Sequence, residues 1–236
     1  MGRFSEFVFG RSKLPERCLI YAGAYVPWRK DWVRRSFDRW SRIRGNWVKY
    51  SFATKKSRDY VLAFNVYGGS VTLELLRLLK DGCARRIFFI GSLGAKDLPI
   101  GTIVMPSKVI DKAGPVLVDT HPNEIVRPDK GSQARLRRTL QNLGISHVEG
   151  TIVSVPCVLH NILKVKKFAE QDSTILGVEL ETSTFYHYSK KEGFESYALL
   201  YVSDNEQHDI ISRAKNVLEA RRNALRAITN VALEVL

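Results

Sequence analysis

The stretch 174–204 constrains the fold of this 236-residue chain more than any other part of the sequence. An apolar run leads to two acids, Glu179 and Glu181; a helix-length segment follows, and a second apolar run ends in Ser203 and Asp204. This order predicts a strand, a helix and a strand, with carboxylates where each strand ends. Because ligands in open α/β sheets bind at the carboxyl ends of the strands, these acids are expected to face one crevice. The spacing alone fits equally well with acids that cap helices or lie in solvent.

The rest of the chain alternates apolar runs and helix-length segments in the same way. Strands are expected at 18–23, 47–53, 60–66, 86–90, 103–110 and 148–155, and helices at 30–40, 68–81, 132–143, 159–169 and 212–236. No segment has the composition of a linker, and no internal repeat is present. The alternation predicts an α/β fold: a single-domain three-layer sandwich with a mixed, mostly parallel central sheet flanked by helices. Residues 1–16 lack a clear period and are interpreted as an N-terminal arm.

The net charge of +13 is the unusual bulk property of the chain. Such an excess suits nucleic acid or a negatively charged small substrate, and it equally describes a solvated basic surface. Part of it is a local cluster in which arginines alternate with tryptophans: Arg34, Arg35, Arg39, Arg42 and Arg44 with Trp28, Trp32, Trp40 and Trp47. This mixture suits stacking on bases, but we favour tryptophans that pack inward or against another subunit.

The three cysteines, Cys18, Cys83 and Cys157, lie far apart and show no metal-ligand spacing with the histidines. They are interpreted as reduced thiols of a cytoplasmic protein, and no metal site is expected. The first ten residues lack a continuous apolar core, so no signal peptide is expected. No apolar run is long enough to span a membrane, and a membrane partner is therefore not expected.

A glycine-rich segment follows the apolar run 86–90. Residues 91–95 read Gly-Ser-Leu-Gly-Ala. Glycines at such a place let backbone amides approach an anion, and a serine hydroxyl can donate to phosphate. The segment matches neither a dinucleotide-binding fingerprint nor a P-loop, so the pattern alone favours a plain tight turn.

Four motifs in the right order resemble one enzyme family. Residues 178–181, Val-Glu-Leu-Glu, and 203–204, Ser-Asp, resemble the Val-Glu-Met-Glu and Ser-Asp motifs of the nucleoside phosphorylases. Residues 91–95 and 98–104 resemble the Gly-Ser-x-Gly-Ala and Val-Gly-Asp-Ile-Val segments of the same family. The most similar branch is that of the small-subunit purine nucleoside phosphorylases, which usually form hexamers. The resemblance implies that 17–236 is a nucleoside phosphorylase-like catalytic domain.

The resemblance also implies an activity: cleavage of the N-glycosidic bond of nucleosides, with inorganic phosphate as co-substrate and no other cofactor. Glu181 matches the glutamate that binds the ribose 2′- and 3′-hydroxyls. Leu180 stands where a methionine packs under the sugar, and Glu179 is the supporting acid of the motif. Val158 falls where the family stacks an aromatic ring on the base. Because the transition state resembles an oxocarbenium ion, a carboxylate near the sugar stabilises it.

The base is expected at the second motif. Asp204 matches the acid that protonates or hydrogen-bonds purine N7, and Ser203 precedes it. An acid there makes the base a better leaving group, which points to purines because the pyrimidine branch recognises its base differently. The family places an arginine beside this aspartate; Arg221 is the best match, with Arg222 and Arg213 as alternatives.

The expected phosphate site is incomplete. Gly23 and Arg29 resemble the N-terminal phosphate loop of the family, and Ser92 matches its phosphate-binding serine. Arg44 resembles the arginine that a neighbouring subunit contributes, which implies a homodimer or homohexamer with shared active sites. However, Phe89 stands where a phosphate-binding arginine is expected, so a charged bidentate ligand is missing there.

Three functions therefore stay open. Phosphorolysis to free base and ribose 1-phosphate is favoured by the residues that match the phosphate site. A hydrolytic purine nucleosidase of the methylthioadenosine type also lacks the missing arginine, but that branch activates water with a glutamate in the first loop, and 21–30 contains no acid. The alternative from another class is a basic nucleic-acid or nucleotide-binding protein; nucleic acid is the less favoured partner.

Overall fold

The computed structural model describes residues 2–23, 27–46, 48–112, 125–157, 172–209 and 211–236. The described helices are α1 (Arg3–Phe9), α2 (Pro27–Arg34), α3 (Gly69–Asp81), α4 (Lys130–Asn142), α6 (Thr182–Glu192) and α7 (Lys215–Val235). The described strands are β1 (Arg17–Ala22), β2 (Arg39–Trp40), β3 (Lys49–Lys55), β4 (Arg58–Val66), β5 (Arg86–Ala95), β6 (Ile103–Asp111), β7 (Ile125–Val126), β8 (Val148–Ser154), β9 (Ile175–Glu179) and β10 (Glu195–Asp204).

These strands form one mixed sheet in the order β10-β6-β8-β9-β5-β1-β4-β3-β2, with β7 beside β6. Strands β4, β1, β5 and β10 are parallel to one another, so their carboxyl ends lie at one edge. Because β10 also pairs with β5, the strands β5, β10, β6, β8 and β9 close into a ring of pairings. The β3–β4 hairpin extends the sheet on the other side of β1.

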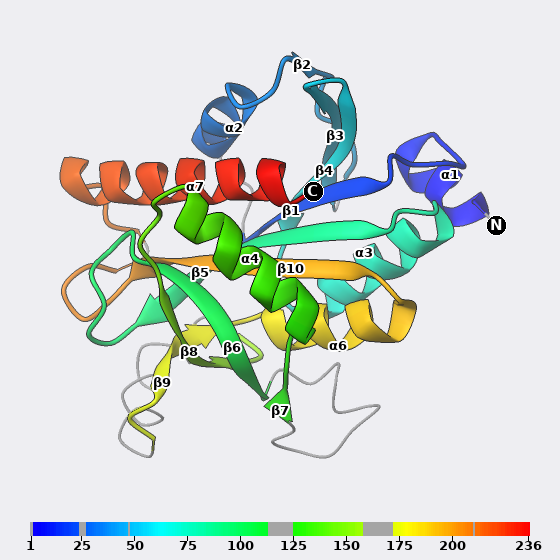
Figure 1. The fold of residues 1–236 in the computed structure, drawn as a ribbon. Helices are drawn as coiled ribbons and strands as arrows, with labels where there is room; N and C mark the ends of the chain where they lie inside the picture. Colours follow the sequence, from blue (N-terminus) through cyan, green and yellow to red (C-terminus); the bar gives the residue numbers. More distant parts are fainter. Residues whose placement is uncertain (1, 24–26, 47, 113–124, 158–171, 210) are drawn as a thin grey trace.

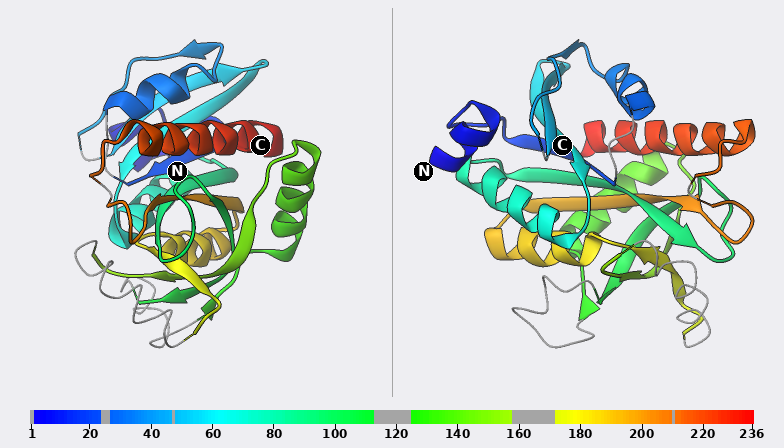
Figure 2. Two further views of the ribbon diagram at one scale, coloured as in Figure 1. Left: turned by 90° about the vertical axis from the view of Figure 1, so that its left-hand side faces the viewer. Right: turned by 180° about the vertical axis from the view of Figure 1, so that it is seen from behind.

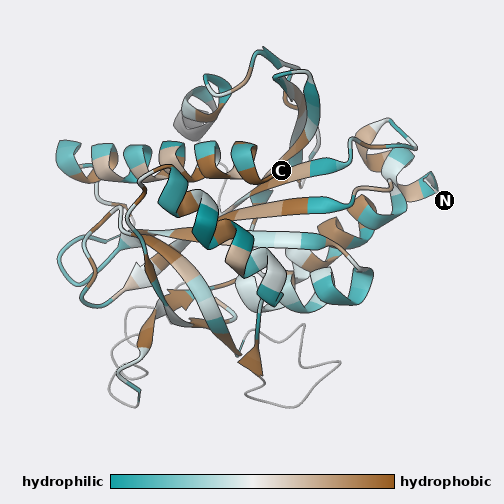
Figure 3. Ribbon diagram, viewed as in Figure 1, coloured by the Kyte–Doolittle hydropathy of each residue, from teal (hydrophilic) through white to brown (hydrophobic). Residues whose placement is uncertain are grey.

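Helices cover both faces of this sheet (Figures 1 and 2). On one face α3 and α6 bury Leu75, Leu76, Leu79 and Phe185 against the strands. On the other face α7 and α4 bury a second cluster that includes Leu225, Ile228 and Leu136. Helix α7 is amphipathic, as the alternating colours along it show (Figure 3), and α2 packs against it. The predicted α/β fold with helices on both sides of a mixed sheet is confirmed.

The helix predicted at 30–40 is wrong beyond Arg34. Phe37 is buried with its ring 5.7 Å from that of Trp40, and Arg39–Trp40 pair with β3 as strand β2. The aromatic spacing that suggested one helical face therefore belongs to a helix followed by a turn and a strand. Other differences are smaller. Residues 1–16, interpreted as an arm, contain helix α1, whose first amides are capped by Asp81. The helix predicted at 159–169 lies outside the described residues and stays a prediction.

The tight turn favoured for 91–95 is also wrong, because β5 continues through Ala95 and pairs with β10 along its length. Glycine is needed there for close approach: a Cβ on Gly94 would lie 2.9 Å from a carboxylate oxygen of Asp204. Likewise, a Cβ on Gly177 would lie 2.3 Å from the carbonyl oxygen of Gly94. Within the described part of the chain, no helix is long and apolar enough to cross a membrane.

Candidate active site

The two acidic motifs meet at the end of β5. Gly94 pairs with Asp204 of β10 on one side and with Val178 of β9 on the other. Two strand spacings, about 10 Å in all, therefore separate the backbones of β10 and β9 at this level. Strand β9 runs antiparallel to β5, so the acids converge because β5 lies between them, and not because all three strands are parallel neighbours. The structure thus brings the Glu179–Glu181 turn and Asp204 to one region.

Glu181 is buried, with 4% of its surface exposed, at the start of α6. Its Oε1 accepts a hydrogen bond of 2.7 Å from the backbone N–H of Gly68, which directly precedes α3. Burial, together with the nearby charge of Glu179, raises the pKa of Glu181 to about 8. The side chain is therefore held in one position by the backbone and keeps its proton near neutral pH.

Glu179 has a different task. It accepts from the Ser154 hydroxyl and, at 2.7 Å each, from the backbone N–H groups of Glu181 and Thr182. Burial raises the pKa of Glu179 as well, but three donors at a helix N-terminus favour its ionised form, so Glu181 is the member of the pair that holds the proton. Ser154 in turn accepts from the backbone N–H of Ser183 at 2.9 Å. Glu179 thus fixes the turn that carries Glu181.

Asp204 ends β10 and is partly buried. Burial raises the pKa of the Asp204 carboxyl, and the charge of Asp209 raises it further. The Ser203 hydroxyl, which donates a hydrogen bond to Asp204, and the charge of Arg221 both lower this pKa. Buried Arg221 donates to the backbone carbonyls of Ser203 at 2.8 Å, Asp209 at 2.8 Å and Ser212 at 3.0 Å. The structure therefore brings Arg221 to Asp204, where it holds the chain that follows β10.

The residues predicted to bind phosphate are placed less closely together. Ser92 lies within β5 opposite Tyr201 and is partly exposed, whereas Gly23 uses its N–H to donate to the Val66 carbonyl at 2.7 Å. Arg44 is exposed near the start of β3, in a bridge with Tyr50. The structure does not bring it to the two acids within one chain.

Phe89 is fully buried, and its ring stacks on that of Phe185 from α6 at a centroid distance of 4.9 Å. The position that the resemblance assigns to a phosphate-binding arginine is thus part of the apolar core. Leu180 is also buried, with Val153 and Val178. The side chain of Arg29 and the whole of Val158 lie outside the described residues.

The sequence did not predict several of the residues that surround the acids. Gly68 was predicted only as the start of a helix, although its amide holds Glu181. Burial raises the pKa of the Tyr67 hydroxyl most, and its neighbours Glu181 and Cys157 raise this pKa further. Ser154 was part of a predicted strand only. The Gly68-Gly69 pair at the start of the helix was the available signal for Gly68. Tyr67 and Ser154 could not be predicted, because their roles depend on contacts between distant segments. No cluster of potential metal ligands occurs among the described residues.

The profile of the Phosphorylase superfamily matches residues 68–236. The chain belongs to this superfamily. The matched region includes both acidic motifs, the glycine-rich end of β5 and Arg221, so the resemblance drawn from the motifs is confirmed at the level of the superfamily. The superfamily contains enzymes that act on nucleosides, both phosphorylases and nucleosidases. No curated protein sequence matches this chain.

Solved structures of superfamily members share the fold at low identity. Uridine phosphorylase from Vibrio fischeri is 16% identical, with a TM-score of 0.79 over 92% of this chain and 89% of that one. The 5′-methylthioadenosine/S-adenosylhomocysteine nucleosidase of Campylobacter jejuni is 18% identical, with a TM-score of 0.73 over 94% and 98%. Futalosine hydrolase of Helicobacter pylori is 13% identical, with a TM-score of 0.72 over 93% and 96%. These neighbours include both a phosphorylase and hydrolytic enzymes.

Proposed function

We propose that this superfamily member cleaves the N-glycosidic bond of purine nucleosides by phosphorolysis, releasing the free base and ribose 1-phosphate. The observation that carries the proposal is the placement of Asp204 on one side of Gly94 and of the strand leading to Glu181 on the other, with a raised pKa for both acids. This separation suits a ligand with a sugar at one end and a base at the other. The catalytic domain is proposed to be 17–236.

Asp204 is the proposed general acid. Burial favours its protonated form, so it can donate a proton to purine N7 as the bond from the sugar to the base breaks. The bonding electrons leave with the base, which departs neutral, while a phosphate oxygen forms the new bond to the anomeric carbon. A positioned general acid contributes about 10²–10⁴-fold. Arg221 is proposed to position Asp204 by holding the loop around it.

Glu181 is the proposed ligand of the ribose hydroxyls. One of its oxygens already accepts from Gly68, so the orientation of the carboxyl is set before the sugar arrives. Hydroxyls that donate to this carboxyl favour its ionised form, and an ionised carboxylate stabilises the positive charge that develops on the sugar. Binding of a nucleoside is therefore expected to release a proton near neutral pH. Glu179 supports this residue, and Leu180 is proposed to pack beneath the sugar.

Phosphate is proposed to be bound by Ser92, Gly23 and Arg29, with Arg44 contributed by a neighbouring subunit of a homodimer or homohexamer. The exposure of Arg44 supports a role outside its own chain. The second candidate is hydrolysis, and one observation favours it: Phe89 fills the place of the missing phosphate ligand with an apolar ring stacked on Phe185. Water would then replace phosphate as the nucleophile.

Base release from adenosine, inosine, guanosine, methylthioadenosine and uridine, each with and without phosphate, tests the proposal. Phosphorolysis predicts release from purine nucleosides that depends on phosphate and yields a sugar 1-phosphate. Release at the same rate without phosphate would establish the nucleosidase instead. Release from uridine alone would overturn the purine assignment, and no release from any nucleoside would overturn the function as a whole.

A further inference from the structure

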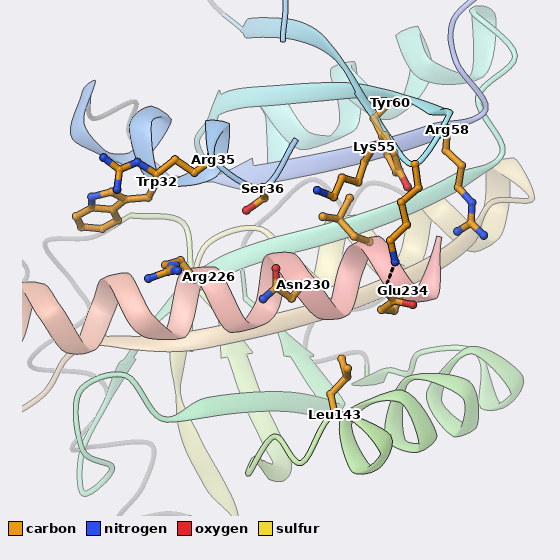
Figure 4. Close-up of a pocket in the computed structure, with 12 residues that line it drawn as sticks. Trp32, Arg35, Ser36, Lys55, Arg58, Tyr60, Leu143, Arg226, Asn230 and Glu234 are labelled. Atoms are coloured by element: carbon orange, nitrogen blue, oxygen red, sulfur yellow. Dashed lines mark hydrogen bonds and ion pairs between the residues drawn. The ribbon is translucent and has the colours of Figure 1, made fainter. Parts of the chain in front are cut away.

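A second concave site lies outside the candidate active site. It is a pocket of about 390 Å³ between α2, the tip of the β3–β4 hairpin and α7 (Figure 4). Residues from these three elements line it, among them Trp32, Arg35, Lys55, Arg58, Arg226 and Asn230. Its volume is within the range of small-molecule sites.

The pocket is separate from the acids of the candidate active site, none of which lines it. Tyr60, which lines it, is near the start of β4, whereas Gly68 follows the other end of that strand. At about 3.3 Å per residue, the six steps from Tyr60 to Val66 span roughly 20 Å. Along α7, the pocket residues run from Arg226 to Glu234, which lie about 7.5 Å and about 20 Å beyond Arg221 at 1.5 Å per residue. One helix thus supplies residues to two separate sites.

The charge of the lining is strongly positive. Five basic side chains contribute to it (Arg35, Lys55, Lys56, Arg58 and Arg226), against the single acid Glu234. Lys56 pairs with Glu234 at 3.3 Å, and Lys55 pairs with Asp38 at 3.0 Å. Arg35 and Arg226 form no ion pair within the described parts of the chain and are exposed. Like charges held at one concavity repel one another unless an anion is bound.

The hairpin tip that carries the lysines is in an unfavourable conformation. Lys56 and Ser57 have φ values of 46° and 62°, a region that glycine and asparagine prefer in such turns. Asp38 holds the tip by accepting from the Lys56 backbone N–H at 2.8 Å as well as from the Lys55 ammonium. Strained positions that the surroundings hold in place are typical of functional sites. The lysines are thus placed beside the pocket by a fixed turn and not by mobile side chains alone.

The aromatic residue Trp32 lines the same pocket as the arginines (Figure 4). Its ring is partly exposed, and the guanidinium of Arg222 lies 5.6 Å from the ring centroid. Guanidinium groups bind phosphate oxygens in a bidentate manner, and an indole ring stacks on a nucleobase. Of the arginines and tryptophans that cluster in the sequence, Arg35 and Trp32 line this pocket.

We propose that this basic pocket binds a phosphorylated ligand of nucleotide size, with the phosphates on Arg35 and Arg226 and the base beside Trp32. Three elements surround the pocket that the cations line. This favours a small ligand over a nucleic-acid strand, because a strand needs an extended groove. The proposal is independent of the reaction at Glu181 and Asp204, because no residue is shared between the two sites.

Calorimetric titration of the full chain with ATP, and with a single-stranded oligonucleotide in parallel, tests the proposal. ATP is expected to bind, and Arg35→Gln and Arg226→Gln are each expected to weaken binding at least about tenfold, the loss of one charge-assisted contact. Both arginines are exposed, so the fold should survive, and unchanged melting temperatures check this. Arg138→Gln, at an exposed arginine of α4 away from the pocket, is the matched control and should bind as the wild type.

Four results would overturn the proposal. The first is no heat of binding with millimolar ATP. The second is equal weakening by Arg138→Gln, which would show a diffuse effect of net charge. The third is oligonucleotide binding that is tighter than that of ATP and increases with length, which would show a surface for nucleic acid. Loss of ATP binding in Glu181→Gln but not in Arg226→Gln would place the nucleotide at the nucleoside site, and would also count against the pocket.

Discussion

Helix α7 takes part in two sites of opposite character. Arg221 is buried and donates to three backbone carbonyls beside buried acids, whereas Arg226, five residues further along α7, is exposed in a basic pocket. The acids are held by backbone N–H groups that the fold places, so their geometry is set before any ligand arrives. The cations of the pocket are mostly exposed, and Arg35 and Arg226 form no ion pair within the described parts of the chain. The difference separates a site built for chemistry from one built for binding.

The largest effect is expected at the acidic site. Asp204→Asn keeps the shape of the side chain but removes the proton donor, and base release should fall about 10²–10⁴-fold. Glu206→Gln, at an exposed acid two residues further along the same loop, should leave the rate within about twofold. Steady-state rates for both variants with one nucleoside make the comparison. Full activity of Asp204→Asn would refute its role as the general acid.

Removal of Arg221 is the next largest expected effect, and it acts on stability. Arg221→Ala removes three hydrogen bonds to backbone carbonyls, so the free energy of unfolding should fall by about 2–4 kcal/mol. Its neighbour Arg222 has a 3.8 Å ion pair and the contact with Trp32, so Arg222→Ala should cost only about 1 kcal/mol. Urea denaturation measures both. Equal costs would contradict the contrast between buried Arg221 and its partly exposed neighbour Arg222.

The third effect concerns pH. The pKa of Glu181 is raised from 4.5 to about 8 in the folded state, so above pH 4.5 the unfolded chain loses this proton before the folded one does. This contribution therefore destabilises the fold progressively as pH rises towards 8. Glu181→Gln removes it, and the variant should gain on the order of 1–3 kcal/mol relative to wild type between pH 4.5 and 8. Urea denaturation across this range tests the sign, with exposed Glu6→Gln as the control.

The smallest effect is expected at the basic pocket. Ser57→Gly relieves an L-residue from a φ of 62° and should stabilise the chain by about 0.5–1 kcal/mol. Ser70→Gly, at an exposed position of α3, should instead destabilise it by about 0.5 kcal/mol. Thermal unfolding resolves the opposite signs. If Ser57→Gly destabilises the chain, the turn is not strained. The argument that a strained turn positions the lysines beside the pocket would then lose its support.

The sequence predicted those parts of the site that depend on local order. An apolar run followed by acids placed Glu179 and Asp204 at strand ends, where the structure has them, and Glu181 follows β9 directly before α6. It did not predict that Gly68 holds Glu181, because 113 residues separate them. It misassigned 37–40 because the aromatic spacing of a helix and that of a turn leading into a strand coincide there. The basic pocket was equally out of reach, since Lys56 and Glu234 meet across 178 residues.

In the proposed reaction, one nucleoside contacts Glu181 through its sugar and Asp204 through its base. The direct measurement compares kcat/KM for a ribonucleoside and its 2′-deoxy analogue in wild type, Glu181→Gln and Asp204→Asn. We expect wild type to prefer the ribonucleoside, Glu181→Gln to lose most of this preference, and Asp204→Asn to keep it at a much lower rate. A preference that stays the same in Glu181→Gln, or that falls equally in both variants, would contradict the assignment of the sugar to Glu181.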